Sequence, residues 1–249
     1  YELIDSLPED GVGVFNADDP HCRVLADRTD RCVMRYGTLR PPGSGLDISA
    51  LGIEHRERAV SFKIQDRYGP EELVCVGILG STNVSNLLAA AAVARLCGMS
   101  LLEVARAAHD IQPVPHRLQP IDGAGGVLVI DDAYNSNPVG ATAALKVLGD
   151  MPGRRKLLVT PGMVELGGRH NVEHEAFGRY AAKVCDTVIL IGSRRTAPLL
   201  NGLLAAKFPA DQVMVVASLE EARTHLSSLL APGDVVLFEN DLPDNYDEV

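Results

Sequence analysis

An unusual density of polar side chains follows an apolar stretch that ends near residue 132. Two carboxylates, a tyrosine and two amides occur within residues 131–138, whose sequence is Asp-Asp-Ala-Tyr-Asn-Ser-Asn-Pro. A carboxylate here can accept hydrogen bonds from both hydroxyls of a ribose, and an amide can bind a phosphate or a base edge. The cluster therefore predicts a nucleotide contact that includes Asp132. The alternative is that Asp132 and Asn137 only cap the next helix, and capping is the favoured interpretation for Asn137, which precedes Pro138.

A second pair of amides, Asn83 and Asn86, lies one helical turn apart just before an alanine-rich run at residues 87–94. That spacing places both side chains on one face at the start of a helix. Amides present paired donor and acceptor groups, so the pair can bind the edge of an adenine. The alternatives are that one of the two is the N-cap of the helix and that the other has no role.

A glycine-rich loop at residues 160–168 follows the next apolar run. Its glycines allow a backbone to approach closely. Glu165 in the loop and His174 beyond it supply polar groups that we expect on the same side of the sheet. The alternative is an ordinary solvated loop between a strand and a helix.

Arg117 lies at the junction of the two regions of the chain, directly after a predicted helical hairpin. An arginine at such a place is suited to holding a phosphate, although a surface arginine is the more common case. The GxxxxGK[ST] phosphate-binding loop, the GxGxxG fingerprint, the GxSxG elbow and the HExxH motif are all absent from the sequence. The seven histidines lack the spacing of metal ligands, so we predict no metal site within the chain.

The elements that must position these residues alternate regularly in the second half of the chain. Strands are predicted at residues 126–132, 156–160, 187–191, 212–216 and 234–238, and helices at residues 138–148, 174–184, 197–207 and 219–230. Continuous apolar strands are typical of a parallel sheet that is covered on both faces. We therefore expect an open, doubly wound α/β domain at residues 117–249, with its ligands at the carboxyl ends of the strands.

The first half of the chain has a different pattern. Strand, helix and strand are predicted at residues 11–16, 20–27 and 32–36, and three closely spaced strands at residues 47–54, 59–65 and 72–78. The short polar turns between the last three predict an antiparallel meander. Helices at residues 83–98 and 100–111, the second opened by a capping box of Ser100 and Glu103, predict a helical hairpin. We expect this first domain to cover residues 1–116.

Composition excludes several classes of protein. The 249 residues are 46% hydrophobic and 22% charged, with a net charge of −10. This excludes intrinsic disorder and disfavours a nucleic-acid surface, which needs clustered lysine and arginine. The longest apolar stretch, residues 87–102, contains Arg95 and is shorter than a membrane span. Because the five cysteines form no CxxC pair and the acidic N-terminus is not a signal peptide, we expect a cytoplasmic protein, with no particular oligomeric state indicated.

Several short motifs, taken in order, resemble those of the Mur ligases. They are Asn16-Ala-Asp-Asp19, Gly80-x-x-Asn83-x-x-Asn86, Pro115-His-Arg-Leu118, Asp131-Asp-Ala-Tyr-Asn-Ser-Asn-Pro138, Gly162-Met-Val-Glu-Leu-Gly167 and His174. The resemblance implies that residues 1–116 are the second half of the central, ATP-binding domain of that family. It also implies that residues 117–249 are its Rossmann-like C-terminal domain. The phosphate-binding loop, the Mg²⁺ ligands and a domain that binds a UDP sugar would then precede residue 1.

The resemblance also implies a reaction, the ATP-dependent ligation of an amide in the synthesis of peptidoglycan precursors for the cell wall. ATP phosphorylates a carboxylate of a nucleotide-linked peptide, and the amine of an amino acid or dipeptide attacks the acyl phosphate. By this resemblance, Asn83 and Asn86 would contact adenine, Arg117 would hold the terminal phosphate and Asp132 would bind ribose. Three further residues would line the nucleotide edge of a cleft shared by the two domains: Tyr134, Asn135 and Asn137. Glu165 and His174 would face the acceptor amine. Without a phosphate-binding loop, we expect the chain alone to be inactive.

Two departures from the family pattern are notable. His116 stands where the family has glycine before the arginine, and the last predicted strand continues into Glu239-Asn-Asp-Leu-Pro-Asp-Asn-Tyr246 where the family has Lys-Gly-Ser-Arg. An acidic segment repels a carboxylate on the acceptor, so the identity of the amine stays open. The segment also motivates a second hypothesis, a non-catalytic nucleotide-sensing or interaction module that is derived from a Mur ligase and docks a basic partner through this tail.

Overall fold

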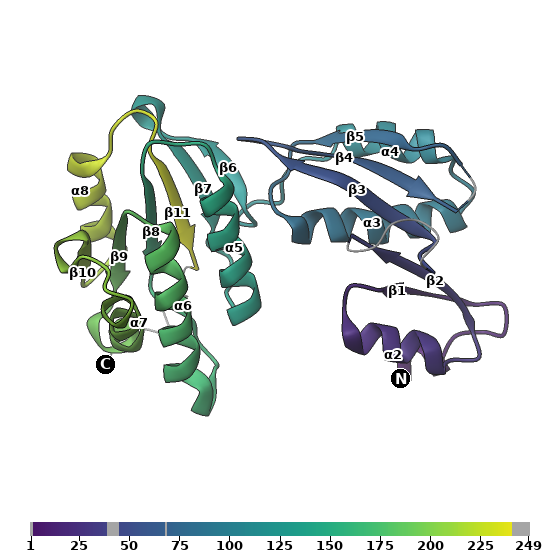
Figure 1. Ribbon diagram of the computed structural model, residues 1–249, viewed down its shortest axis with the longest axis horizontal. Coiled ribbons are helices and arrows are strands. Elements are labelled where there is room, and N and C mark those ends of the chain that lie inside the picture. Colours follow the sequence, from purple (N-terminus) through teal and green to yellow (C-terminus); the bar gives the residue numbers. More distant parts are fainter. Residues whose placement is uncertain (1, 39–44, 68, 241–249) are drawn as a thin grey trace. The chain divides into compact units, whose positions relative to one another are not determined.

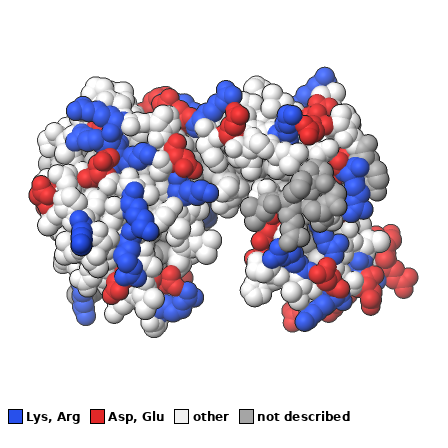
Figure 2. All heavy atoms as spheres, in the orientation of Figure 1, with Lys and Arg blue, Asp and Glu red and all other residues white. Residues whose placement is uncertain are grey.

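The computed structural model describes residues 2–38, 45–67 and 69–240, and the chain divides into two compact units. The first unit is Tyr1–Gln112 and the second is Pro113–Val249, so the division lies a few residues before the predicted one. Among the helices of the described residues, none is both long and apolar enough to cross a membrane. On the face drawn in Figure 2, acidic and basic side chains of the described residues are interspersed over both units.

The first unit is built on a five-stranded sheet with strands in sequential order (Figure 1). Its elements are α1 (Glu2–Asp5), β1 (Val12–Asn16), α2 (Pro20–Arg28), β2 (Cys32–Gly37), β3 (Ile48–His55), β4 (Val60–Asp66), β5 (Glu72–Val76), α3 (Ser81–Leu96) and α4 (Leu101–His109). β1, β2 and β3 are parallel, whereas β3, β4 and β5 are antiparallel. The predicted meander and the Ser100–Glu103 capping box are thus confirmed.

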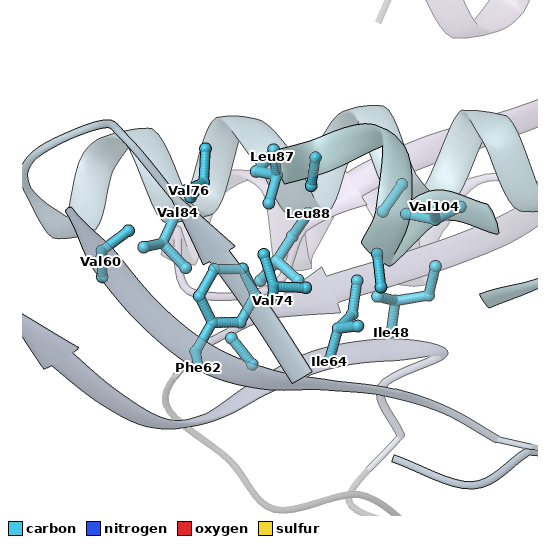
Figure 3. Packing of buried hydrophobic residues seen from close by; sticks show 14 of the residues in the cluster. Ile48, Val60, Phe62, Ile64, Val74, Val76, Val84, Leu87, Leu88 and Val104 are labelled. Atoms are coloured by element: carbon cyan, nitrogen blue, oxygen red, sulfur yellow. The ribbon is translucent and has the colours of Figure 1, made fainter. Parts of the chain in front are cut away.

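Alternation along β4 builds the core of the first unit. Val60, Phe62 and Ile64 point to one face of the sheet and are at most 1% exposed, because side chains two residues apart in a strand share a face. They pack against Val84 and Leu88, which lie one helical turn apart on α3 (Figure 3). This packing fixes the start of α3, where the predicted amide pair lies.

The second unit is built on a six-stranded sheet in the order β10-β9-β8-β11-β7-β6. Its elements are β6 (Gln119–Asp122), β7 (Leu128–Asp132), α5 (Pro138–Asp150), β8 (Lys156–Thr160), α6 (His170–Val184), β9 (Thr187–Ile191), α7 (Ser193–Ala205), β10 (Val213–Val216), α8 (Leu219–Leu229) and β11 (Val235–Glu239), with short 3₁₀ turns at Ala124–Gly126, Gly167–Arg169 and Ala210–Gln212. β7 to β11 are parallel, and β6 joins the edge antiparallel to β7.

The connections of this sheet make it doubly wound. Right-handed crossovers place α5, α6 and α7 on one face. The chain then turns back from β10 to β11, so α8 covers the other face, where Ala222 and Leu226 pack against Val159, Ile189 and Val236. The predicted fold class is confirmed, and β11 inserts between β8 and β7 as the last strand.

Some element boundaries differ from the predictions for physical reasons. β6 was not predicted, because a four-residue edge strand that contains Pro120 lacks an apolar alternation, and proline is tolerated at a sheet edge. α6 begins at His170 rather than at residue 174, because the preceding 3₁₀ turn leads directly into the helix. α8 begins at the predicted residue, after Ser218, whose hydroxyl accepts from the backbone N–H of Glu221.

Glycines allow α6 and α7 to pack backbone against backbone. A Cβ atom on Gly178 would lie 2.2 Å from the Leu199 carbonyl oxygen. We expect Gly178→Ala to lower the free energy of unfolding by about 1–3 kcal/mol, because neither backbone segment is a flexible side-chain end that can yield. Gly168→Ala is the control, since a Cβ there meets no atom within 4 Å. Equal urea midpoints for the two variants would refute this account of the interface.

Candidate functional site

The predicted polar cluster lies at the carboxyl edge of the six-stranded sheet. β7 ends at Asp132, β8 at Thr160 and β11 at Glu239, and β11 lies between the other two. Ligands of open α/β sheets bind at this edge because the loops that follow the strands meet there. The cluster therefore lies on the side of the second unit where the sequence placed it.

Arg117 is held against the loop that follows β7. Its Nη1 donates a 2.7 Å hydrogen bond to the Asn135 side-chain oxygen, and its Cζ lies 4.2 Å from the centroid of the Tyr134 ring. The Arg117 side chain remains exposed. Since a guanidinium carries five N–H donors, this arrangement orients the group and leaves it able to bind an anion.

A strained turn presents Arg117. His116 and Leu118 have φ angles of 60° and 48°, in a left-handed region that non-glycine residues adopt only when neighbouring contacts hold them. The contacts are His116 Nδ1 to Asp131 Oδ2 at 2.8 Å, and the Leu118 N–H donating to Asp132 Oδ1 at 3.0 Å. The left-handed backbone at residue 116 also gives a physical reason for the glycine expected there in the family pattern.

Burial and hydrogen bonding have opposite effects on the carboxyl group of Asp132. Burial raises the pKa of its carboxyl, while the backbone N–H of Leu118 and the positive charge of Arg117 oppose the rise. One carboxylate oxygen is already engaged by the turn that carries Arg117. Asp132 thus helps to position Arg117, and its predicted contact with a ribose stays a prediction.

The predicted N-cap role of Asn137 is confirmed. Its side-chain oxygen accepts from the backbone N–H groups of Val139 and Gly140 at 3.1 and 2.9 Å, at the start of α5. Because the cap uses the oxygen, the amide N–H₂ group is the part of Asn137 that a ligand would contact.

Asn83 and Asn86 lie in the first unit, and neither is the N-cap that we considered. Gly80, with φ 83°, holds that position, and α3 begins at Ser81. The Asn83 amide donates to the Leu79 carbonyl oxygen at 2.9 Å, and the Asn86 amide donates to the Asn83 side-chain oxygen at 3.4 Å. The two side chains share one face as predicted, and Asn86 is exposed.

His174 lies in the interior of the second unit, which corrects its expected place facing an acceptor. It is 0% exposed, its Nε2 accepts from the Met163 N–H at 2.9 Å, and its Nδ1 lies 2.8 Å from the His170 carbonyl oxygen. Burial lowers the pKa of the ring. A neutral His174 therefore holds the loop after β8, and contact with a substrate would break both hydrogen bonds. Glu165 is exposed on that loop, with a left-handed φ of 63°.

Sequence reasoning missed the buried carboxyl of Glu239. The last strand extends one residue beyond its predicted end, so Glu239 is 1% exposed and Asn240 6% exposed instead of opening an acidic tail. The Ser136 hydroxyl donates to Glu239 Oε1, and the Thr160 hydroxyl donates to Oε2 at 3.2 Å. Burial, assisted by nearby Asp132, raises the pKa of Glu239 to about 7. Because Glu239 and Asn240 are buried, these two residues do not support the hypothesis that an acidic tail docks a basic partner. Residues 241–246 of the predicted tail lie outside the described residues.

Comparisons with known proteins place both units. The description "Mur ligase middle domain" matches residues 1–94, and "Mur ligase, glutamate ligase domain" matches residues 116–239. A UDP-N-acetylmuramoyl-tripeptide–D-alanyl-D-alanine ligase of Mycobacterium leprae (strain TN) is 34% identical over 262 residues, 96% of this chain and 50% of the relative. The enzyme of the same name from Escherichia coli (strain K12) is 33% identical over 79% of this chain and 43% of its own length.

Solved structures show the same likeness. MurF from Acinetobacter baumannii has a TM-score of 0.79 and 26% identity, and covers 96% of this chain and 50% of its own. MurF from Thermotoga maritima, solved in complex with ADP, has a TM-score of 0.79 at 23% identity, with 96% and 52% coverage, and at that identity it supports the fold alone. The chain thus spans about half the length of the relatives it matches.

Proposed function

Because the chain belongs to the Mur ligase family, we propose that it forms the middle and C-terminal part of an ATP-dependent amide ligase of peptidoglycan precursor synthesis. The observation that carries the proposal is Arg117, which Asn135 and Tyr134 orient at the carboxyl edge of the sheet. An oriented, exposed guanidinium is suited to a phosphate that changes its bonding during a reaction. We further propose that the reaction takes place in the cytoplasm, where ATP is available.

The proposed reaction has two steps. A carboxylate oxygen of the nucleotide-linked peptide attacks the terminal phosphorus of ATP, so that an acyl phosphate forms and ADP leaves. The amine acceptor then attacks the acyl carbon, an amide forms and inorganic phosphate leaves with the electron pair of the broken bond. Relatives named for their D-alanyl-D-alanine acceptor support a dipeptide as the amine.

The residues of this chain position groups in those steps. Arg117 binds the transferring phosphate and stabilises the charge that develops on it. Stabilisation of this kind by a preorganised donor is usually the largest single contribution to catalysis. Asp132 binds ribose, Asn83 and Asn86 bind adenine, and Tyr134 with the amide groups of Asn135 and Asn137 lines the nucleotide. Glu165 is proposed on the acceptor side, with His174 supporting that loop from below.

Magnesium is not assigned to this chain. Among the described residues, no group of three or more histidine, cysteine, aspartate or glutamate side chains could hold a metal ion, and the sequence has no GxxxxGK[ST] loop. We propose that the triphosphate and metal ligands come from the part of the relatives that this chain does not cover.

The chain alone is expected to bind ADP or ATP weakly and to hydrolyse ATP no faster than a buffer control. The reason is that the chain supplies the proposed adenine, ribose and phosphate contacts, whereas its sequence lacks the GxxxxGK[ST] loop that grips the β- and γ-phosphates. Calorimetric titration measures the binding, and phosphate release measures hydrolysis. ATP hydrolysis at the rate of an intact ligase would overturn this division of labour.

A further inference from the structure

A side-chain hydrogen bond links the loop between β7 and α5 to the end of β11, and the proposed reaction does not use this bond. Tyr134 and Asn135 face Arg117, whereas Ser136, between them and the α5 cap, donates its hydroxyl to Glu239 Oε1. Since Ser136 is the residue next to Asn135, its position limits where the Arg117 partners lie. The tip of β11 is therefore linked to the nucleotide loop by a side-chain hydrogen bond.

The same tip also holds the loop that follows β8. Glu239 Oε2 accepts from the Thr160 hydroxyl, and the Thr160 oxygen accepts in turn from the Gly162 N–H at 3.0 Å. Next to it, the Asn240 amide donates to the Gly162 carbonyl oxygen at 2.6 Å, and the Asn240 N–H donates to the Asp132 carbonyl oxygen at 3.2 Å. One buried carboxyl thus joins the two loops that follow the neighbouring strands.

We propose that Glu239 is a positioning residue for the nucleotide site: through Ser136 it holds the loop that presents Tyr134 and Asn135 to Arg117. The inference rests on the proposed function for the ligand, but the coupling from Glu239 to Arg117 belongs to this chain without any ligand. Glu239 itself contacts no substrate in this account.

The proposal implies a pH dependence, which the surroundings of Glu239 determine. Asp132, its register partner on β7, is the facing carboxylate and disfavours a second charge. β8 contributes the neutral hydroxyl of Thr160, and the charged side chains of α5, Lys146 and Asp150, are exposed to solvent. Both hydroxyls donate to the Glu239 carboxyl, an arrangement that a charged carboxylate satisfies and that a protonated carboxyl, which donates through one oxygen, cannot keep in full. Raising the pH through about 7 is therefore expected to strengthen the Ser136 hydrogen bond that holds the loop.

The first test uses NMR spectra of the ligand-free chain as a function of pH. The Arg117 Nε–H signal and the backbone signals of residues 133–137 are expected to titrate with a midpoint near pH 7 in the wild type and to lose that titration in Glu239→Gln. In Ser136→Ala the midpoint should move to higher pH, because the lost hydroxyl donates a hydrogen bond that favours the charged carboxyl. Glu220→Gln, an exposed site on α8, is the control and should match the wild type.

The second test measures ADP affinity of the same variants by calorimetry. Ser136→Ala is expected to bind ADP about tenfold more weakly, the effect of losing one net hydrogen bond that positions the site. The ADP affinity of Glu239→Gln should lack the change between pH 6 and 8 that the wild type shows. If the Arg117 signals show the same pH dependence in both variants as in the wild type, the inference is overturned while the proposed function stands. If the signals respond but wild-type chain fails to bind ADP, the nucleotide assignment fails and the coupling survives.

Discussion

Replacement of Arg117 by alanine in the proposed full-length ligase is expected to lower kcat by about 10²–10³-fold, the effect of removing one preorganised donor from a transferring phosphate. The guanidinium needs no reorganisation to act, because Asn135 and Tyr134 already hold it. Phosphate release in the presence of ATP, the nucleotide-linked peptide and a dipeptide acceptor measures the effect.

Matched variants separate this role from general loss of charge. Arg117→Lys keeps the charge but loses the planar fork, so we expect activity between that of alanine and wild type. Arg179→Ala removes an exposed arginine that pairs with Glu175 along α6, and it should behave as wild type. Full activity of a folded Arg117→Ala protein would remove the phosphate-binding role.

The second large effect concerns stability. Between pH 5 and pH 8 the second unit is expected to lose about 2–3 kcal/mol of unfolding free energy through Glu239, because each unit of pKa difference is worth about 1.4 kcal/mol. The pKa of Glu239 is raised to about 7 in the folded state, from 4.5. The folded chain therefore holds a proton that the unfolded chain releases, so stability falls as pH rises from the unfolded pKa to the folded one. Burial also raises the pKa of Asp132, which acts in the same direction.

Chemical unfolding at several pH values checks this effect, with NMR signals from β7 and β11 as reporters of the second unit. Glu239→Gln has no proton to lose, so it should be less dependent on pH and more stable than the wild type at pH 8. A wild type and a glutamine variant with parallel pH profiles would show that Glu239 does not titrate in this range.

Local sequence signals predicted most elements well. β8 begins and ends at the predicted residues, and the caps at Asn137 and Ser100 mark helix starts correctly, because cap chemistry depends on a few adjacent residues. β6 escaped prediction because a short edge strand owes its place to β7 rather than to its own pattern. Strand order, with β11 between β8 and β7, likewise depends on contacts distant in sequence.

The candidate site shows the same division. The 131–138 cluster could be predicted because strand end and polar groups are adjacent in sequence, whereas its link to Glu239 joins residues far apart. His174 illustrates the converse: its sequence position suggested an exposed polar group, but helix α6 turns the ring inward to the Met163 N–H. Side-chain burial is set by tertiary packing, which residue type alone does not reveal.

The most direct test of the central claim is an NMR titration of this chain with ADP. We predict saturable shifts of the Arg117 Nε–H and of the Tyr134 ring, both with one apparent Kd. Saturable shifts that leave the Arg117 and Tyr134 signals unchanged would contradict the assignment of a nucleotide site to the carboxyl edge of the second sheet.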